Sequence, residues 1–263
     1  MKQTANQELV SIADVIRGAN ATTTVRYKNT YDVECLDSEG NVKWKDKIEN
    51  LVVNVGLDDV LDKYFKGSTY TAAHYVGLFT EVGTAAITGA TVATPGVIST
   101  GSTTGLTNGD VVRINNVVGM TELNGNEYVI SSLIADTSFE IPTTAGFTAY
   151  TSGGDWWEDP VIAADTMASH ASWTEAVPYS DGTRPSFNNT AAVSAQSLTN
   201  SANKAVFNIN ASATVGGCFV STDSTKSGSS GTLFGGGVFT QGSKPVTNGD
   251  TLNVTLTFST SSV

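Results

Sequence analysis

The sequence predicts a mainly β protein: a jelly-roll-like β-sandwich with one short helix, an N-terminal arm and an inserted small β-barrel. Short apolar runs alternate with polar residues and are separated by turn residues at roughly ten-residue intervals, which is typical of sandwiches and barrels. Hydrophobic residues make up 40% of the 263 residues and charged residues only 15%. Gly, Ser, Thr and Asn take the place of charge, as expected for a β protein with many turns.

Residues 1–26 are predicted to form an arm. Leu9, Ile12, Val15 and Ile16 fall at helical spacing, which predicts a short amphipathic helix over 8–17. The turn-rich stretch GANATTT then separates this helix from the body. We expect Leu9, Ile12 and Ile16 to dock the arm on a neighbouring subunit, and a frayed terminus is the alternative.

The body is predicted to comprise residues 27–83 and 155–263, and it begins with a hairpin over 27–53. Tyr31, Val33 and Cys35 alternate with polar residues before a glycine-containing turn at 37–41. A helix should follow, with Gly67 as its C-terminal stop. Its apolar positions share the spacing of a single buried face, and they are Leu57, Val60, Leu61, Tyr64 and Phe65.

The rest of the body is predicted to be strands, at 75–79, 192–198, 204–212, 214–221, 232–239 and 250–258. The clearest follows an Asn-Gly turn at 248–249 and alternates from Leu252 to Phe258. The glycine-rich stretch around Gly235 to Gly237 lacks the GK[ST] signature of a phosphate loop. These glycines should instead let neighbouring backbones pack closely.

Residues 84–154 are predicted to be a separate module inserted into the body. Residues 81–105 carry almost no charge, and short strands are expected near 111–116, 128–130, 139–141 and 147–150. Insertions of this kind are tolerated at exposed loop tips. Trp156 and Trp157 follow the insert directly, and we expect them to fix the hinge between the two parts.

Composition argues against several functions. The net charge is −11 and no run of Lys or Arg is present, so nucleic-acid binding is disfavoured. No stretch approaches 18 apolar residues, and residues 1–20 lack the continuous apolar segment of a signal peptide, so we expect no membrane insertion. Cys35 and Cys218 are interpreted as buried free thiols, with a single disulfide left open.

The candidate catalytic groups are few. His74 and His170 are the only histidines, and Asp165, Ser169 and His170 could in principle form a triad, but no nucleophile elbow surrounds any serine. The preferred interpretation is a polar loop with Asp165 as the N-cap of a short helix. No spacing in the sequence indicates a metal site, although the two histidines with a carboxylate remain an alternative.

One pair of carboxyl groups lies directly after the two tryptophans. Glu158 and Asp159 adjoin Trp156 and Trp157, and a carboxyl pair beside aromatic rings is the arrangement found in glycoside hydrolysis. An exposed junction at the domain boundary is the preferred interpretation, with sugar binding as an alternative. We therefore predict that the protein is not an enzyme, and we assign no catalytic, cofactor-binding or metal-binding residue and no cofactor.

The body resembles a family of structural proteins of tailed-bacteriophage virions. The segments that carry the resemblance are residues 50–65 (NLVVNVGLDDVLDKYF), 75–79 (YVGLF), 164–175 (ADTMASHASWTE), 179–185 (YSDGTRP), 203–210 (NKAVFNIN), 217–220 (GCFV) and 249–254 (GDTLNV). Together they cover most of the body. The resemblance implies a virion protein assembled in the host bacterial cytoplasm, without saying where in the particle it sits.

Residues 109–130 (GDVVRINNVVGMTELNGNEYVI) resemble a small β-barrel module known from ubiquitin-activating enzymes and also found in phage structural proteins. This resemblance implies a fold and no activity. The resulting hypothesis is a capsid decoration or cement protein that packs on the major capsid protein and on copies of itself. The alternative is a tail-associated fibre or adaptor protein that contacts host surface glycans through the insert or the Trp156–Trp157 region.

Overall fold

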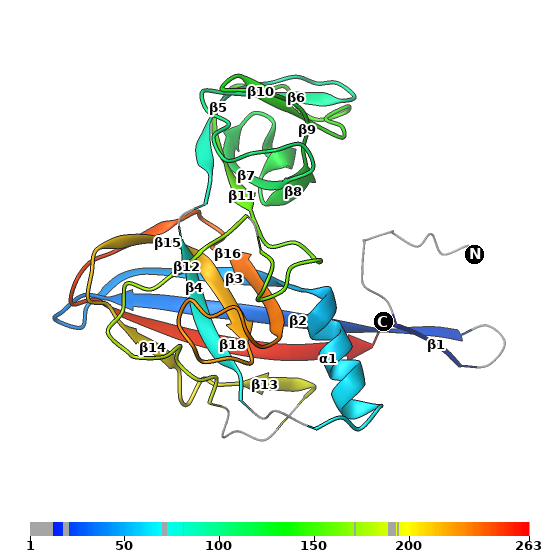
Figure 1. Ribbon diagram of the computed structural model, residues 1–263. Helices are drawn as coiled ribbons and strands as arrows, with labels where there is room; N and C mark the ends of the chain where they lie inside the picture. The colour runs from blue at the N-terminus through cyan, green and yellow to red at the C-terminus, as the bar shows by residue number, and fades with distance from the viewer. Residues whose placement is uncertain are drawn as a thin grey trace.

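The computed structural model describes residues 13–17, 21–69, 73–80, 82–170, 172–188, 193 and 195–262. It confirms the prediction of a mainly β protein with one α-helix and a small inserted barrel. The described residues form an antiparallel sheet of 11 strands and a second sheet of 7 strands. Figure 1 shows the 7-stranded unit standing on one side of the larger body, joined to it by two chain crossings.

Within the described residues, the body contains 12 regular elements: β1 (Ala13–Arg17), β2 (Ala21–Leu36), β3 (Val42–Val52), α1 (Asn54–Tyr64), β4 (Tyr75–Thr80), β12 (Glu175–Ala176), β13 (Ser197–Thr199), β14 (Ala205–Asn208), β15 (Ala213–Ser221), β16 (Leu233–Val238), β17 (Lys244–Val246) and β18 (Thr251–Ser262). The strand order is β12-β4-β15-β16-β3-β2-β18-β13, with β1 on β2, β14 on β18 and β17 on β15.

The body is a sandwich whose two layers belong to one hydrogen-bonded sheet. Its main core combines residues of β2 and β18 with residues of β4 and β15, so these pairs of strands face each other. The layers are continuous at one side, where the end of β3 pairs with β16 while the rest of β3 pairs with β2. The alternation of apolar and polar residues within each strand is a local pattern. The continuity of the two layers instead depends on the pairing of β3 with β16, which is distant in the sequence.

The β2–β3 hairpin agrees with the predicted hairpin. Tyr31, Val33 and Cys35 point into the core with at most 2% exposure. The turn between the strands is closed by Asp37, whose Oδ1 accepts hydrogen bonds from the backbone N–H groups of Glu39 and Asn41 at 3.0 and 2.8 Å. Cys35 and Cys218 are both buried and both free, so no disulfide joins them.

The glycines of β16 serve the predicted purpose. This strand lies between β15 and β3. A Cβ atom at Gly237 would come within 2.7 Å of the carbonyl oxygen of Glu49 on β3. The close approach of the two backbones therefore requires glycine at this position.

The insert is a nearly closed barrel of seven strands: β5 (Thr84–Ala90), β6 (Gly96–Thr100), β7 (Val111–Val118), β8 (Asn126–Val129), β9 (Ser131–Ile134), β10 (Ser138–Ile141) and β11 (Ser152–Asp159), with a short 3-10 turn η1 (Thr121–Leu123). The order is β8-β7-β11-β5-β6-β10-β9. The strand predicted at 147–150 is wrong. A turn at Gly146, with φ of 85°, precedes this stretch, and the hydroxyl of Tyr150 bonds the carbonyl oxygens of Ile87 and Gly153.

Helix α1 exists where the periodicity predicts it, but the predicted apolar face is covered only in part, with Leu57 and Val60 half-buried. Gly56 is its only buried residue, and a Cβ there would lie 2.9 Å from the Cα of Phe234. Leu61, Tyr64 and Phe65 are 52, 80 and 74% exposed. The helix approaches the sheet closely through its first turn, and Val60 still packs against the main core. The residues that follow extend past the packing that the described part of the body provides.

The arm also differs from the prediction. Residues 13–17 form β1 instead of the second half of a helix over 8–17, and β1 pairs with the first residues of β2. Strand β2 continues through residue 26, the predicted boundary of the arm, without a break. The competing factor is tertiary: an extended β2 offers a hydrogen-bonding edge, which overrides a short helical periodicity. Ile16 lies in β1, whereas Leu9 and Ile12 lie outside the described residues.

Candidate functional site

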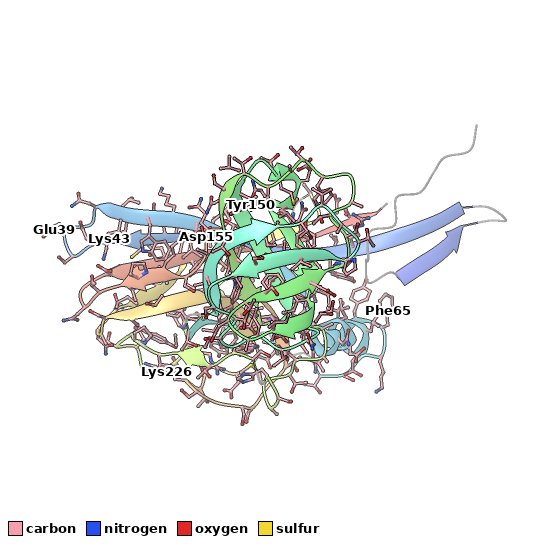
Figure 2. All side chains as sticks on the ribbon, turned by 90° about the horizontal axis from the view of Figure 1, so that it is seen from above. Glu39, Lys43, Phe65, Tyr150, Asp155 and Lys226 are labelled. Atoms are coloured by element: carbon pink, nitrogen blue, oxygen red, sulfur yellow. The ribbon has the colours of Figure 1, made fainter. Side chains whose placement is uncertain are left out.

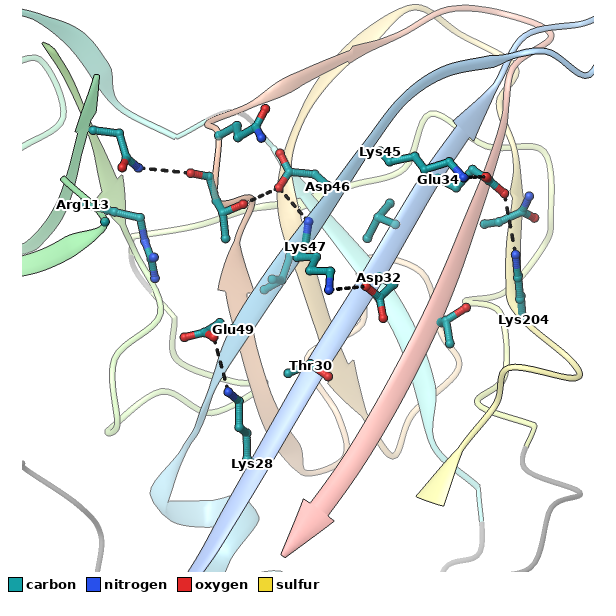
Figure 3. A pocket seen from close by; sticks show the side chains of 18 residues that line it. Lys28, Thr30, Asp32, Glu34, Lys45, Asp46, Lys47, Glu49, Arg113 and Lys204 are labelled. Atoms are coloured by element: carbon teal, nitrogen blue, oxygen red, sulfur yellow. Dashed lines mark hydrogen bonds and ion pairs between the residues drawn. The ribbon is translucent and has the colours of Figure 1, made fainter. Parts of the chain in front are cut away.

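A polar cleft of about 1020 Å³ lies between the barrel and the outer face of the body sheet. Its floor comprises residues of β2, β3 and β18, and the side nearer the barrel includes Arg113 and Asn115 of β7. Figure 3 shows these side chains, with the barrel strand at one side and the long sheet strands across the floor. Five basic and four acidic side chains line it: Lys28, Lys45, Lys47, Arg113, Lys204, Asp32, Glu34, Asp46 and Glu49.

The charges on the floor of the cleft are paired across strands. The register places Asp32 opposite Lys47 and Glu34 opposite Lys45. Their charged atoms lie 3.5 and 2.6 Å apart, and Lys204 also approaches Glu34 at 3.7 Å. Exposed pairs of this kind contribute roughly 0–1 kcal/mol each. They make the floor a neutralised polar surface and leave no concentrated charge to hold an ionic ligand.

Asp46 joins the cleft to the loop beneath the barrel. Its side chain is fully buried. Oδ1 accepts hydrogen bonds from the Thr240 hydroxyl at 2.6 Å and from the Lys47 backbone N–H at 2.7 Å, and Lys244 lies 3.3 Å from Oδ2. Asn115 of the barrel donates to the Thr240 carbonyl at 3.3 Å. The carboxylate therefore fixes a loop that the barrel itself contacts.

Trp156 and Trp157, the predicted hinge residues, lie next to each other on β11 and belong to different cores. Trp156 is fully buried in the barrel, where its Nε1 donates to the Thr100 hydroxyl at 3.0 Å. Trp157 is 3% exposed and packs in the body with Phe79 and Trp173. Successive residues of a strand point to opposite faces, so one strand anchors both parts of the protein. Neither indole offers a face for a sugar to stack on.

Of the two carboxyl groups after these tryptophans, Glu158 is buried and Asp159 is half-buried, so neither is freely exposed at the junction as predicted. Burial raises the pKa of Glu158 to about 7, and the nearby charge of Asp110 adds to the rise. Burial and the charge of Glu127 also raise the pKa of Asp159 to about 7. Consecutive strand positions point these carboxyl groups to opposite sides, an arrangement that does not place them together across a sugar.

The residues considered for a catalytic triad do not come together as one. Asp165 accepts hydrogen bonds from the Trp173 indole at 3.0 Å and from the Ile162 backbone N–H at 3.2 Å. The His170 ring stacks on Trp173 at 3.8 Å, and its Nδ1 lies 2.9 Å from the Trp173 carbonyl. Residues 161–170 form turns, so the prediction that Asp165 caps a short helix is wrong. Asp165 instead fixes a turn, because its carboxylate accepts hydrogen bonds from the buried Trp173 indole and from the Ile162 backbone N–H.

The other chemistry-bearing side chains are dispersed. His74 packs against Phe234 and Phe258, whereas His170 stacks on Trp173, so the two histidines have different neighbours. Burial lowers the pKa of His74. Burial raises the pKa of the Cys35 thiol to about 12, which removes its reactivity at neutral pH. Within the part of the chain that the structure describes, no three His, Cys, Asp or Glu residues form a group that could hold a metal ion. No helix there is long and apolar enough to cross a membrane.

A buried ion pair was not predicted from the sequence. The Arg184 side chain has no exposure and forms two hydrogen bonds with the Glu175 carboxylate, at 2.9 and 2.7 Å. Its remaining donors reach the carbonyl oxygens of Asp223 and Gly228 at 2.8 and 3.0 Å. Arg184 thus holds the loop between β15 and β16 against β12. A lone arginine within YSDGTRP, in a region poor in charge, was the available signal.

The barrel is the part of the chain for which a family is found. Residues 93–156 match the family model of the ubiquitin-activating enzyme E1 FCCH domain. This FCCH-like module coincides with β6 to β11 up to Trp156, and it accounts for less than half of the chain. No curated protein matches the sequence. The likeness describes the fold of the insert and makes no statement about the body.

Proposed function

We propose that this protein is a non-enzymatic structural component of a tailed-phage virion, and specifically a decoration or cement protein on the capsid. The observation that carries the proposal is the projecting FCCH-like module, anchored by Trp156 on one side of β11 and Trp157 on the other. A projecting module of this kind fits a protein whose body packs on a shell while the module points outward. The resemblance of the body's sequence to virion proteins supports the phage assignment.

Two properties of the surface support a packing role. The chain is poor in charge, and the charges on the cleft floor are already paired with each other. Large subunit contacts are depleted in charged residues at their centres, because burying unpaired charge is costly. The proposed partners are therefore the major capsid protein, other virion proteins and copies of this chain, with assembly in the bacterial cytoplasm.

The copy number in purified virions tests the proposal. Quantitative mass spectrometry against the major capsid protein should give a ratio near one per capsid subunit, or one per few. A count of about a dozen, the scale of tail and vertex rings with closed symmetry, would favour the alternative of a tail fibre or adaptor protein that contacts host glycans. Absence from purified virions would overturn both assignments.

A further inference from the structure

The end of α1 carries an exposed apolar surface, here called the helix patch and made of Leu61, Tyr64 and Phe65. These side chains are 52, 80 and 74% exposed, and the last two rings contact each other edge to face at 4.9 Å. Positions i, i+3 and i+4 share one face of a helix, so the three side chains form a continuous surface. Single exposed apolar residues are ordinary, whereas a contiguous group marks an interaction site.

An apolar hollow of about 230 Å³ lies between α1 and the sheet. Val60 lines the hollow from the same turn of α1, and Tyr27, Phe234 and Phe258 line it from the sheet. Tyr27 is itself 38% exposed. The helix patch and the hollow thus adjoin the same turn of α1, through Leu61 and Val60 respectively, and the described part of the chain leaves both open.

The same end of the molecule carries a two-stranded ribbon formed by β1 and the first residues of β2. Ala13–Arg17 pair with residues 21–25 of β2, and of these only Val25 also has a partner in β18. Figures 1 and 2 show the ribbon continuing the line of β2 beyond the body, on the side of the molecule that carries α1. A two-stranded hairpin alone is marginally stable in water, and a free strand edge invites pairing.

We propose that the N-terminal arm of a second copy of this chain covers the helix patch, and that each copy of a two-fold dimer donates one arm and accepts the other. The two paired strands of the ribbon run away from their own body, so the far ends of their described residues lie away from α1 (Figure 1). A copy facing it across a two-fold axis presents the same patch in return, as an isologous interface requires.

The length and composition of the arm fit this role. Five residues of ribbon extend about 17 Å, enough to cross the end of a neighbouring helix. Twelve further residues precede Ala13 and join the ribbon at its foot, and their sequence includes Leu9, Val10 and Ile12. Residues 13–25 contain one acidic and one basic residue, Asp14 and Arg17, so little charge would be desolvated against an apolar patch.

The inference rests on the proposed function, which includes contacts between copies of this chain. Sedimentation velocity of the purified full-length protein tests the dimer without any virion. The wild type should dimerise with rising concentration. Tyr64→Ser with Phe65→Ser, and separately deletion of residues 1–20, should each weaken the dimer about tenfold or more. Val129→Ser is the matched control, since Val129 is 55% exposed on the barrel, and it should leave the dimer unchanged.

A cross-linking experiment identifies the occupant. A photoreactive phenylalanine analogue at position 65, in a mixture of unlabelled and ¹⁵N-labelled copies, should join position 65 of one isotope to residues 1–25 of the other. A monomeric wild type, a dimer unaffected by the patch variant, or cross-links only within one isotopic copy would each overturn the proposal. A dimer with these cross-links but no copies in purified virions would sink the phage assignment and leave the inference standing.

Discussion

Two pairs of adjacent aromatic residues have opposite environments in this protein. Trp156 and Trp157 are at most 3% exposed, whereas Tyr64 and Phe65 are at least 74% exposed. The first pair lies on a strand with a core on each side, and the second lies on a helix end that extends past its sheet. A pair of adjacent aromatic residues in the sequence can therefore belong either to the cores of two domains or to an exposed contact surface. Only the residues that pack on the pair, which are distant in the sequence, distinguish the two cases.

Truncating the tryptophans should have the largest effect on stability. Trp156→Ala should destabilise the barrel by about 3–5 kcal/mol, because it leaves a large cavity and removes the donor to Thr100. Trp157→Ala should destabilise the body by a similar amount. Hydrogen exchange measured by mass spectrometry should show lost protection first in the barrel for one variant and first in the body for the other.

The Phe variants serve as controls for the indole pair. Trp156→Phe and Trp157→Phe fill much of the same volume, so each should recover most of the protection in its own core. Loss of protection in both parts equally, from either Ala variant, would contradict the assignment of the two indoles to separate cores. The hinge role predicted from the sequence would then reduce to general stability.

The carboxyl groups of the junction should make stability depend on pH. The pKa values of Glu158 and Asp159 are raised from 4.5 and 3.8 to about 7, so the unfolded chain releases these protons at lower pH than the folded chain. The stabilisation from the neutral forms is complete below about pH 4 and is lost as pH rises to about 7. The effect should be smaller than that of a lost indole, because ionisation removes no packing atoms and opens no cavity.

Urea unfolding at several pH values measures this dependence. Glu158→Gln should flatten the decline in the free energy of unfolding between pH 4.5 and 7, since the amide stays neutral. Glu140→Gln, on β10 of the barrel, is the matched control and should leave the slope as in the wild type. Identical slopes for the wild type and Glu158→Gln would show that Glu158 ionises freely in the folded protein.

The local pattern of the sequence predicted what depends on neighbouring residues. Alternation identified the strands that bury Tyr31 and Leu252, and turn residues identified the hairpin around Asp37. It could not show that β3 pairs with both β2 and β16, because that choice is made by strands far along the chain. The same limit explains the partial error at α1: periodicity defines an apolar face, but the extent of its burial depends on distant packing partners, and Leu61 stays 52% exposed.

The candidate surfaces follow the same division. Trp156 and Trp157 were found because a Trp-Trp pair at a change of texture is a local signal, although their opposite cores were not foreseen. The polar cleft was not foreseen, since it requires Arg113 of the insert to lie over the floor of β2 and β3. The extended form of Ala13–Arg17 depends on the pairing of β1 with β2, which the helical spacing of the local sequence does not show.

The exposed pair should have the smallest effect on stability. Tyr64→Ser and Phe65→Ser should each change the free energy of unfolding of the monomer by about 0.5 kcal/mol or less, because exposed side chains away from packing lose little on truncation. Urea unfolding at a concentration below that of dimerisation measures this value. A loss of several kcal/mol would mean that the two rings pack within their own chain, and the contrast with Trp156 and Trp157 would fail. A small loss in the monomer with a larger one at high concentration would assign their contribution to the contact between copies.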